Sequence, residues 1–343
     1  MSLRSEIAEQ PAVVRRLLEG SWADAREAGR MLVAAEHLTI AARGSSDNAA
    51  TYGKYLFEGL AGLVTALAAP SLVTRYRLPP GFARGAVIGI SQSGAAPDVA
   101  AVLAEGRAAR APTLALTNRA GSLVSRSAAR TFLLRAGPER AVAATKTVTA
   151  TCVALALIAA TLAEARGRTA LSLAGLAEAT DEAVAAEPEA ERLARRIGRA
   201  RSIVVLGRGF EYASALEAAL KIKELARVWA EPYSSADFLH GPITLIEPGT
   251  PVLLFGARGA TERESRALCG RLRRRGARVY AVTNDPRLAA AVDDAVLLAR
   301  PLSEALCPIT FVVVAQHVAA SLARRHGRDP ERLVGLSKVT RTR

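Results

Sequence analysis

Three charged side chains recur at helical spacing between residues 215 and 242. Glu217, Lys221 and Glu224 occupy positions i, i+4 and i+7, which places them on one face of a helix. Ala, Leu and Ile surround them, so this polar face is predicted to be partly buried, although a solvated ladder of salt bridges is the commoner outcome. His240 follows a polar loop, in the turn His-Gly-Pro. A carboxylate within reach of a histidine can move protons on a sugar, one group opening the ring and the other transferring hydrogen between C1 and C2.

Lysine is scarce in this chain. Only five of its 46 Lys and Arg residues are lysines, namely Lys54, Lys146, Lys221, Lys223 and Lys338. Arginine keeps its proton in proteins, whereas an amine can lose its proton or form an imine. In a chain dominated by arginine, a surviving lysine is therefore expected to be needed as an amine. Chance survival explains any single one of them equally well.

Serine-rich segments follow two apolar runs in the first half of the chain. Ser91-Gln92-Ser93-Gly94 follows the run 86–90 and precedes a helix-like stretch, and Gly44-Ser45-Ser46 follows the run before it. Hydroxyls, a flexible glycine and free backbone N–H groups make an anion pocket, which Thr145-Lys146-Thr147 would close from a third side. Neither segment is a Walker loop, so a nucleoside triphosphate is not implied. Serine and glycine also end strands that bind nothing.

The elements that would position these residues occur twice, with a period of about 165 residues. LTIAARGSSDNA parallels SIVVLGRGFEYA, AVIGISQSG parallels PVLLFGARG, and PTLALTNRAGSL parallels RVYAVTNDPRLA. Each matched element is a short apolar run followed by a helix-like stretch. Continuous apolar runs indicate strands buried on both faces, hence a parallel sheet between helices. The chain is therefore predicted to be α/β, with two three-layer αβα sandwiches in tandem.

The repeat also predicts the domain organisation. The first α/β domain is expected to bind phosphate. The second is expected to carry the catalytic helix and the histidine loop, with Gly256-Ala257-Arg258-Gly259 in the place of the serine loop. Because this counterpart lacks hydroxyls, one phosphate site per chain is expected. The expected parts are an N-terminal segment of one or two helices over residues 1–36, the first domain over 37–163, a helical connection over 164–200, the second domain over 201–329, and a tail carrying Lys338 over 330–343.

Composition excludes several classes of protein. A formal charge of +14 favours nucleic acid or an anionic substrate, but arginines are mixed with acidic residues, and the dense run 271–275 holds no aromatic residue to stack on bases. Three widely spaced cysteines indicate neither a disulfide framework nor zinc, and no metal or cofactor is expected. The start is polar and acidic, unlike a secretory signal. The longest apolar stretches, 148–163 and 309–323, fall short of the roughly 20 residues that span a bilayer. We expect a soluble, cytoplasmic protein without membrane or nucleic-acid partners.

Several segments together resemble a known family. They run nearly end to end, in the family order: EIAEQP, GSSDNAATYGKYLFE, SQSG, VAATKTVTA, LGRGFEYASALEAALKIKELA, EPYSSADFLHGP and LSKVT. The chain resembles the sugar isomerase (SIS) superfamily, and more specifically the isomerase half of glucosamine–fructose-6-phosphate aminotransferase and its stand-alone relatives. The resemblance implies two tandem SIS domains.

The resemblance also implies roles for individual residues. The sugar phosphate would bind to Ser46, Ser91, Gln92 and Ser93. Glu224 would be the isomerising base, with Lys221 as its neighbour on the helix. His240 would open the ring, reaching into the site of a second subunit of a homodimer, and Lys338 would form an imine with the ketose. Further candidates for substrate binding are Gly44, Ser45, Ala144, Thr145 and Glu217.

The function expected on these grounds is that of an aminosugar-phosphate deaminase/isomerase, which converts glucosamine 6-phosphate and water into fructose 6-phosphate and ammonia. A phosphosugar aldose–ketose isomerase or a ketosamine-phosphate deglycase is the enzymatic alternative. A non-catalytic sugar-phosphate sensor is the alternative of another class, and it predicts the loss of Glu224, His240 or Lys338, all of which are present.

Two departures from the family pattern matter. A helical segment stands where the aminotransferase has its glutaminase domain, so the synthetic direction is not expected. Ala96 stands where the family run SQSGET has threonine, which removes one hydroxyl from the phosphate site and is expected to weaken phosphate binding or to alter the sugar accepted.

Overall fold

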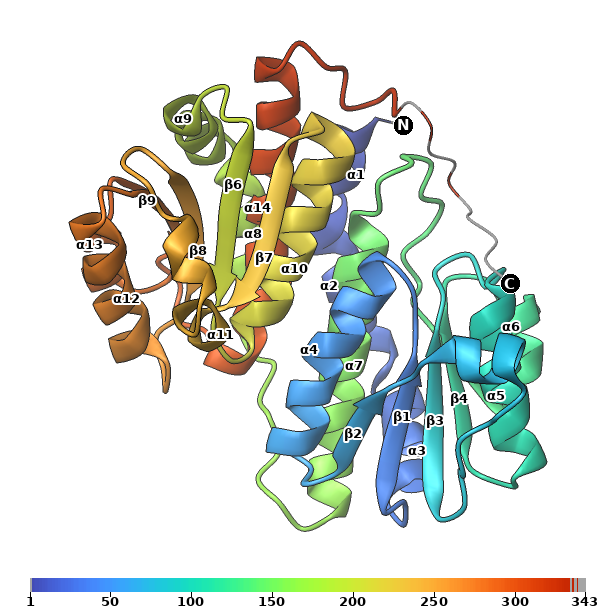
Figure 1. The fold of residues 1–343 in the computed structure, drawn as a ribbon. Helices are drawn as coiled ribbons and strands as arrows, with labels where there is room; N and C mark the ends of the chain where they lie inside the picture. The colour runs from blue at the N-terminus through green and yellow to red at the C-terminus, as the bar shows by residue number, and fades with distance from the viewer. Residues whose placement is uncertain (1, 334, 336–337, 339–343) are drawn as a thin grey trace. The chain divides into compact units, whose positions relative to one another are not determined.

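The computed structural model describes residues 2–333, 335 and 338, and these form two compact units. One unit contains residues 12–140 and 146–174 together with Lys338, and is called the first-sheet unit below. The other contains residues 2–11, 141–145 and 175–333 with residue 335, and is called the second-sheet unit. Each unit holds one five-stranded parallel sheet (Figure 1).

The sheet of the first-sheet unit has the strand order β2-β1-β3-β4-β5, and all neighbours are parallel. The central strands are buried along nearly their whole length, as continuous apolar runs predict. Helices α3, α4 and α7 cover one face, and α5 and α6 cover the other. The bounds are β1 (His37–Ala41), β2 (Val64–Leu67), β3 (Gly85–Ile90), β4 (Thr113–Thr117), β5 (Arg130–Leu133), α2 (Gln10–Gly20), α3 (Trp22–Leu32), α4 (Ser45–Gly59), the π-helix η1 (Leu72–Tyr76), α5 (Pro97–Ala108), α6 (Leu123–Ser127) and α7 (Lys146–Ala165).

The second-sheet unit repeats this plan. Its strand order is β10-β9-β8-β6-β7, again all parallel. Helices α8, α9, α10 and α14 cover one face, and α11, α12 and α13 the other. The bounds are β6 (Ser202–Gly207), β7 (Trp229–Ser234), β8 (Pro251–Gly256), β9 (Arg278–Thr283), β10 (Asp294–Leu297), α1 (Leu3–Ala8), α8 (Leu176–Ala185), α9 (Glu187–Ile197), α10 (Glu211–Lys221), the π-helix η2 (Ile222–Ala226), α11 (Ser235–Leu239), η3 (Pro242–Leu245), α12 (Glu262–Arg274), α13 (Pro286–Ala291), η4 (Glu304–Leu306) and α14 (Cys307–Arg325).

The two sheets have the same strand order once the repeat is taken into account, which confirms the predicted α/β fold with two parallel sheets. The three matched sequence segments are the strand pairs β1/β6, β3/β8 and β4/β9. In both sheets the first and third strands are neighbours, so the chain reverses its direction of travel across the sheet between them. Ligands of open α/β sheets bind beyond the carboxyl ends of two such strands.

The helices differ from expectation in two respects. The N-terminal segment holds three helices rather than one or two, because Gln10 and Trp22 each begin a new helix after a short break. The apolar stretch near residue 150 forms a helix of 20 residues, so the argument that it is too short for a bilayer was wrong. The helices 146–165 and 304–325 are both long and apolar enough to span a membrane, but 89% and 100% of their apolar windows are buried inside the structure. They are core helices of their units.

Candidate active site

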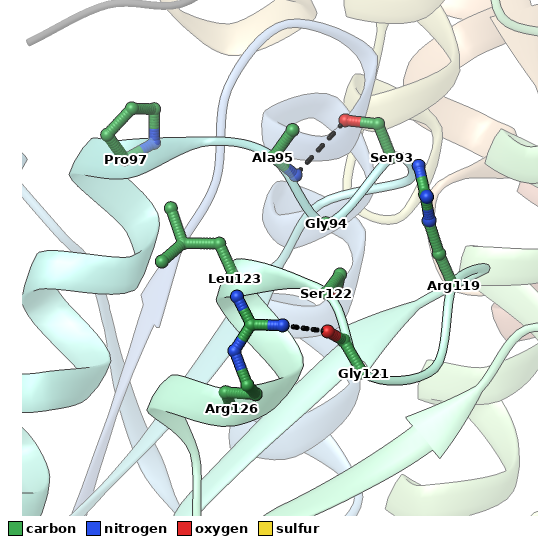
Figure 2. A pocket seen from close by; sticks show the side chains of 9 residues that line it. All are labelled: Ser93, Gly94, Ala95, Pro97, Arg119, Gly121, Ser122, Leu123 and Arg126. Carbon is green, nitrogen blue, oxygen red and sulfur yellow. Dashed lines mark hydrogen bonds between the residues drawn. The ribbon is translucent and has the colours of Figure 1, made fainter.

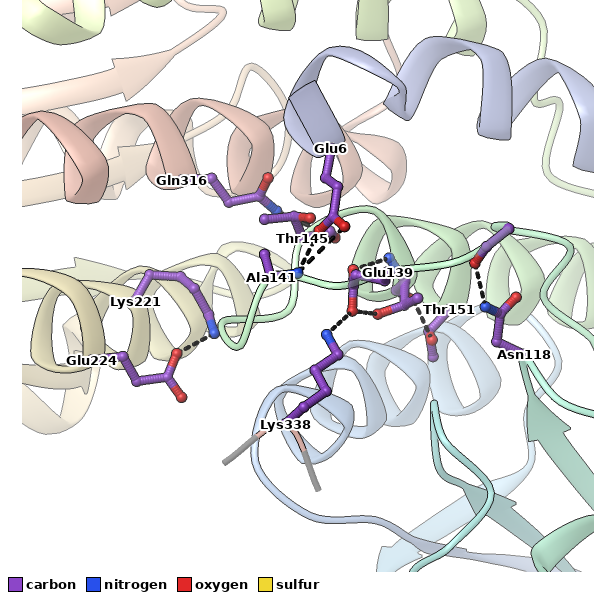
Figure 3. A network of polar contacts seen from close by, with 12 residues as sticks. Glu6, Asn118, Glu139, Ala141, Thr145, Thr151, Lys221, Glu224, Gln316 and Lys338 are labelled. Carbon is purple, nitrogen blue, oxygen red and sulfur yellow. Dashed lines mark hydrogen bonds and ion pairs between the residues drawn. The ribbon is translucent and has the colours of Figure 1, made fainter. Parts of the chain in front are cut away.

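The helix after β6 carries the three charged residues of the predicted polar face. Lys221 ends α10 and donates a hydrogen bond to the carboxylate of Glu224, which lies in η2. The Nζ atom of Lys221 also lies 3.6 Å from Oε1 of Glu217. These contacts place the three side chains on one face, as their spacing predicts. Figure 3 shows the Lys221–Glu224 pair.

Burial separates the members of this group. The side chains of Glu217 and Lys221 are each 1% exposed, whereas that of Glu224 is 22% exposed. A solvated salt-bridge ladder is therefore ruled out. Taking charges out of water is costly unless they are paired, and here one ammonium group lies between two carboxylates. Glu224 is the member of this trio that remains accessible to a ligand.

A π turn shapes the end of this helix. The α-helical hydrogen bonding of α10 stops at Lys221, and Ile222–Ala226 forms a π-helix that ends at Arg227 with a left-handed φ of 52°. At the other end of α10, a Cβ on Gly207 would lie 2.1 Å from the carbonyl oxygen of Glu211, so only glycine lets the helix start this close to β6. Single π turns occur often at functional sites.

His240 lies at the C-terminal cap of the short helix α11, and its side chain is exposed. Gly241 follows with a φ of 150°, and Pro242 then begins η3. The ring makes no hydrogen bond to any residue that the structure describes. Thus the structure leaves the imidazole accessible, in the kind of turn that the sequence predicts.

The serine loop of the first-sheet unit lies at the carboxyl end of β3 and is tied to the next loop of the sheet. The carbonyl of Gln92 accepts hydrogen bonds from the N–H of Asn118 at 3.1 Å and from the hydroxyl of Thr117 at 3.3 Å. Gly94 has a φ of 66°, its carbonyl accepts from the N–H of Val124 at 2.9 Å, and a Cβ on it would lie 2.0 Å from Oγ of Ser122. The glycine of this loop is therefore fixed by close packing as well as by its backbone conformation.

A pocket of about 420 Å³ opens beside this loop (Figure 2). Two arginines, Arg119 and Arg126, line it together with Ser93 and Ser122. Helix α5 begins at Pro97 without a side-chain cap, so its first N–H groups add positive potential at this edge of the sheet. Of the predicted phosphate residues, Ser93 lines this pocket; Ser91 is 7% exposed at the end of β3.

Gly44, Ser45 and Ser46 lie where β1 passes into α4. Gly44 caps the helix with a φ of 56° and supplies no side-chain cap, and the two serines are half-buried in the first turn. Because β1 and β3 are neighbours, these residues and the serine loop share the carboxyl edge of one sheet.

The segment that was expected to close the pocket is largely engaged elsewhere. Thr145, Lys146 and Thr147 are each at most 1% exposed, and none of them lines the pocket. The carbonyl of Thr145 accepts from the side chain of Gln316 at 3.4 Å, within the second-sheet unit. Ala144 is half-buried beside it. A role for Ala144 and Thr145 in substrate binding stays a prediction.

Lys338 is the residue of the terminal motif 336–340 that the structure describes; its four neighbours in the motif lie outside the described residues. Its Nζ donates to Oε2 of Glu139 at 2.6 Å (Figure 3). Glu139 has a fully buried carboxylate that also accepts from the N–H of Thr147 at 3.0 Å and from its hydroxyl at 2.8 Å. The lysine is thus held within the first-sheet unit.

The sequence did not predict a role for Glu139 or for the two arginines that line the pocket. A single glutamate in the segment GPERAVAATKT carries no spacing signal, because its partner lysine is about 200 residues away in the chain. Arg119 and Arg126 lie in an arginine-rich sequence, where composition hides them. Among the described residues no cluster of His, Cys, Asp or Glu is arranged to hold a metal ion.

Comparisons with known proteins identify the domain family of the two repeats. Residues 31–161 and 196–324 match the model of the SIS domain. A glutamine–fructose-6-phosphate aminotransferase of Gloeobacter violaceus is 36% identical over 349 residues, which cover 97% of this chain and 57% of that protein. The chain thus spans little more than half the length of the curated relatives it matches.

Solved structures share the fold over nearly the whole chain. A protein of Silicibacter pomeroyi, named for an expected phosphosugar isomerase activity, superposes with a TM-score of 0.84 at 34% identity, covering 96% of this chain and 100% of that one. Glucosamine-6-phosphate deaminase of Thermotoga maritima superposes with a TM-score of 0.78 at 21% identity, covering all of both chains. At that identity the second likeness concerns the fold alone.

Proposed function

The chain belongs to the SIS domain family, and from that membership we propose that it is an aminosugar-phosphate deaminase/isomerase. The proposed reaction converts glucosamine 6-phosphate and water into fructose 6-phosphate and ammonia. The observation that carries the proposal is the charged group of α10, in which a buried lysine leaves one carboxylate, that of Glu224, open to a ligand. A sensor that only binds sugar phosphate needs no such proton-transfer group.

The proposed roles follow the chemistry of each side chain. The serine loop and the uncapped start of α5 bind the phosphate, with Ser46 at the neighbouring strand end. His240 opens the ring by moving a proton between the ring oxygen and the C1 hydroxyl. Glu224 then removes the proton from C2 and returns it to C1, which leaves an imine at C2. Lys221 keeps the carboxylate of Glu224 oriented throughout.

Lys338 completes the reaction in this proposal. Its amine adds to the C2 imine and displaces ammonia, so that the sugar becomes attached to the protein through a new imine. Water then hydrolyses this second imine, releasing fructose 6-phosphate and restoring the amine. One water is consumed and one ammonia is released for each sugar, and no redox partner is required. The contact with Glu139 supports this role, because a carboxylate that accepts a hydrogen bond from Nζ can hold the amine in place before the reaction.

The experiment mixes the purified protein with glucosamine 6-phosphate and measures ammonia and fructose 6-phosphate together. We expect equal amounts of both products, formed at a rate that Glu224→Gln lowers by about 10²–10⁴-fold. Conversion of glucose 6-phosphate into fructose 6-phosphate without ammonia would make the protein an aldose–ketose isomerase. Turnover of a ketosamine phosphate would make it a deglycase, and saturable binding of the sugars without any turnover would make it a sensor.

The proposed function also includes an oligomeric state and a cellular compartment. We propose that the protein works as a homodimer in which His240 reaches the site of the second subunit, which its exposed position in a surface turn allows. We also propose that it works in the cytoplasm, where phosphorylated sugars are made and consumed. Light scattering would measure the dimer.

A further inference from the structure

The second-sheet unit contains a counterpart of the serine loop. The repeat offset of 165 residues pairs Gly94 with Gly259, and both have a positive φ, 66° and 149°. It also pairs Ala96, where the first loop lacks a hydroxyl, with Thr261, which has one. The loop 256–261 follows β8 and precedes the thirteen-residue helix α12, whose N-terminus has no cap from its own N-cap side chain. This loop therefore keeps the position and the glycine of its counterpart, while its backbone differs from that of its counterpart at this glycine.

A carboxylate of the chain itself fills this loop. Glu304, which begins η4, accepts through Oε2 from the N–H of Ala260 at 2.7 Å. Through Oε1 it accepts from the hydroxyl of Thr261 at 2.8 Å and, at a longer 3.4 Å, from the N–H of Thr261. A Cβ on Gly259 would lie 2.1 Å from Oε2 of Glu304, so the loop must have glycine there for the carboxylate to enter. Backbone N–H groups and a hydroxyl at a helix N-terminus are the donors that a phosphate would use.

A second carboxyl group lies at the neighbouring strand end. Glu211 is the counterpart of Ser46 by the same offset, and it is completely buried at the start of α10. Its Oε2 accepts from the hydroxyl of Ser214 at 2.5 Å, while its Oε1 has no hydrogen-bond partner among the described residues. Burial, with the negative charge of Glu304 as a smaller cause, raises the pKa of Glu211 to about 8. At neutral pH the group thus carries a proton that it can donate to an oxygen atom.

We propose that the loop 256–261 is a second anion-binding loop which the chain occupies with its own carboxylate, Glu304, and which accepts a phosphate group when that carboxylate is removed. Three observations carry the inference. The repeat places this loop where the first unit has its serine loop, and the donors of the loop already hold a carboxylate. In addition, the buried carboxyl group of Glu211, which has one oxygen atom without a hydrogen-bond partner among the described residues, interacts electrostatically with Glu304. Glu304 therefore keeps phosphosugars out of the second-sheet unit. This inference does not depend on the reaction proposed above.

The test compares the wild type with Glu304→Ala, using inorganic phosphate as the probe and amide chemical shifts as the readout. In the variant, phosphate is expected to shift the amides of Ala260 and Thr261 until saturation. In the wild type these two amides should not respond. A second substitution, Thr261→Val in the Glu304→Ala background, removes one donor and should weaken the binding several-fold. The amides of residues 91–94 report on the first loop separately, so the two phosphate sites are judged independently.

Glu262→Ala is the matched control. It removes a negative charge from the first turn of the same helix without vacating the loop, so phosphate should leave the two reporter amides unchanged. If Glu304→Ala is recovered only unfolded, its refolding yield should rise in phosphate beyond the rise seen for the wild type, and chloride should not replace phosphate. The proposal would be overturned if phosphate left the two amides of folded Glu304→Ala unshifted, or if it shifted those of the wild type equally. It would also be overturned if phosphate did not raise the refolding yield of an unfolded variant.

Discussion

The Nζ atom of Lys338 lies 2.6 Å from Oε2 of Glu139, whose carboxylate is buried. This ion pair holds an amine of the C-terminal tail in place. A buried carboxylate requires a cation or several donors, and Glu139 has Lys338 together with both donors of Thr147. The carboxylate would therefore remain oriented after the amine leaves it to react. Glu139 is thus a positioning residue for the lysine in the proposed reaction.

Lys338→Arg should abolish turnover. Arginine keeps the charge and approximate reach of lysine, but its guanidinium cannot form an imine. Incubation of the wild type with fructose 6-phosphate and borohydride should add one sugar phosphate to the peptide that carries residue 338, and the variant should lack this adduct in a mass spectrum. A fully active arginine variant would show that the side chain contributes charge alone.

Glu139→Gln should slow imine formation while leaving Lys338 chemically competent. The amide is neutral and holds the ammonium group less well, so kcat is expected to fall by up to about 100-fold, with a smaller change in KM. The rate of adduct formation with borohydride measures this directly. Thr147→Val is the matched control because it removes a donor to Glu139 and keeps the carboxylate. Equal trapping rates in the wild type and Glu139→Gln would remove Glu139 from the mechanism.

Glu224→Gln should lower kcat by about 10²–10⁴-fold, the usual contribution of a general base, and leave the binding of sugar phosphate nearly unchanged. Ammonia release gives the rate, and calorimetry with fructose 6-phosphate gives the affinity. Glu264→Gln, an exposed carboxylate paired with Arg208, controls for the substitution itself. A variant that retains more than half of the wild-type rate would show that another group moves the proton.

Ser91→Ala combined with Ser93→Ala should raise KM far more than it lowers kcat. Hydrogen bonds to a charged phosphate contribute about 1.5–3 kcal/mol each, and they act on substrate and transition state alike. Steady-state kinetics on glucosamine 6-phosphate separate the two constants. Ser127→Ala, in the nearby helix α6, is the control. Unchanged affinity in the double variant would place the phosphate elsewhere.

Stability should fall as the pH rises through the range in which Glu211 is protonated only in the folded chain. Its pKa is raised from 4.5 to about 8, so the folded state binds this proton more tightly than the unfolded state does. The contribution is complete below about pH 4.5 and is lost progressively as the pH rises to about 8. Glu211→Gln should lack this pH dependence. Over the same pH range, the free energy of unfolding of the wild type should fall by on the order of 3–5 kcal/mol more than that of the variant. Chemical denaturation at pH 5 and pH 8.5 measures the difference; parallel curves for both proteins would show that Glu211 is charged when folded.

The sequence predicted the elements whose signal lies in a few neighbouring residues. The apolar runs of β1, β3 and β4 and their repeats gave the sheets, and the i, i+4, i+7 spacing placed Glu217, Lys221 and Glu224 on one face. None of the four edge strands was predicted. The strand β2 is partly exposed and β7 contains a proline, so neither is a continuous apolar run. The strands β5 and β10 are only four residues long and only partly buried. The π turn at Glu224 was also missed, since its residues fit an ordinary helix.

Contacts between residues far apart in the chain could not be predicted from the sequence. The pair of Lys338 with Glu139 and the entry of Glu304 into the loop 256–261 each depend on how segments far apart in the chain come together. The repeat offset could have marked a different feature, because it aligns Glu211 with Ser46 and so places a carboxyl group where the first unit has a hydroxyl.

The tight packing of Gly94 against Ser122 has a consequence for the entropy of binding. Because the loop after β3 and the loop after β4 are joined by this packing and by backbone hydrogen bonds, they form one preorganised surface. In the proposed reaction, the phosphate of the sugar would meet Ser93 and the arginine-bearing loop with their backbones already in place, so little conformational freedom would remain to be lost on binding. Selectivity of the proposed phosphate site would then depend on its shape and charge rather than on closure around the ligand.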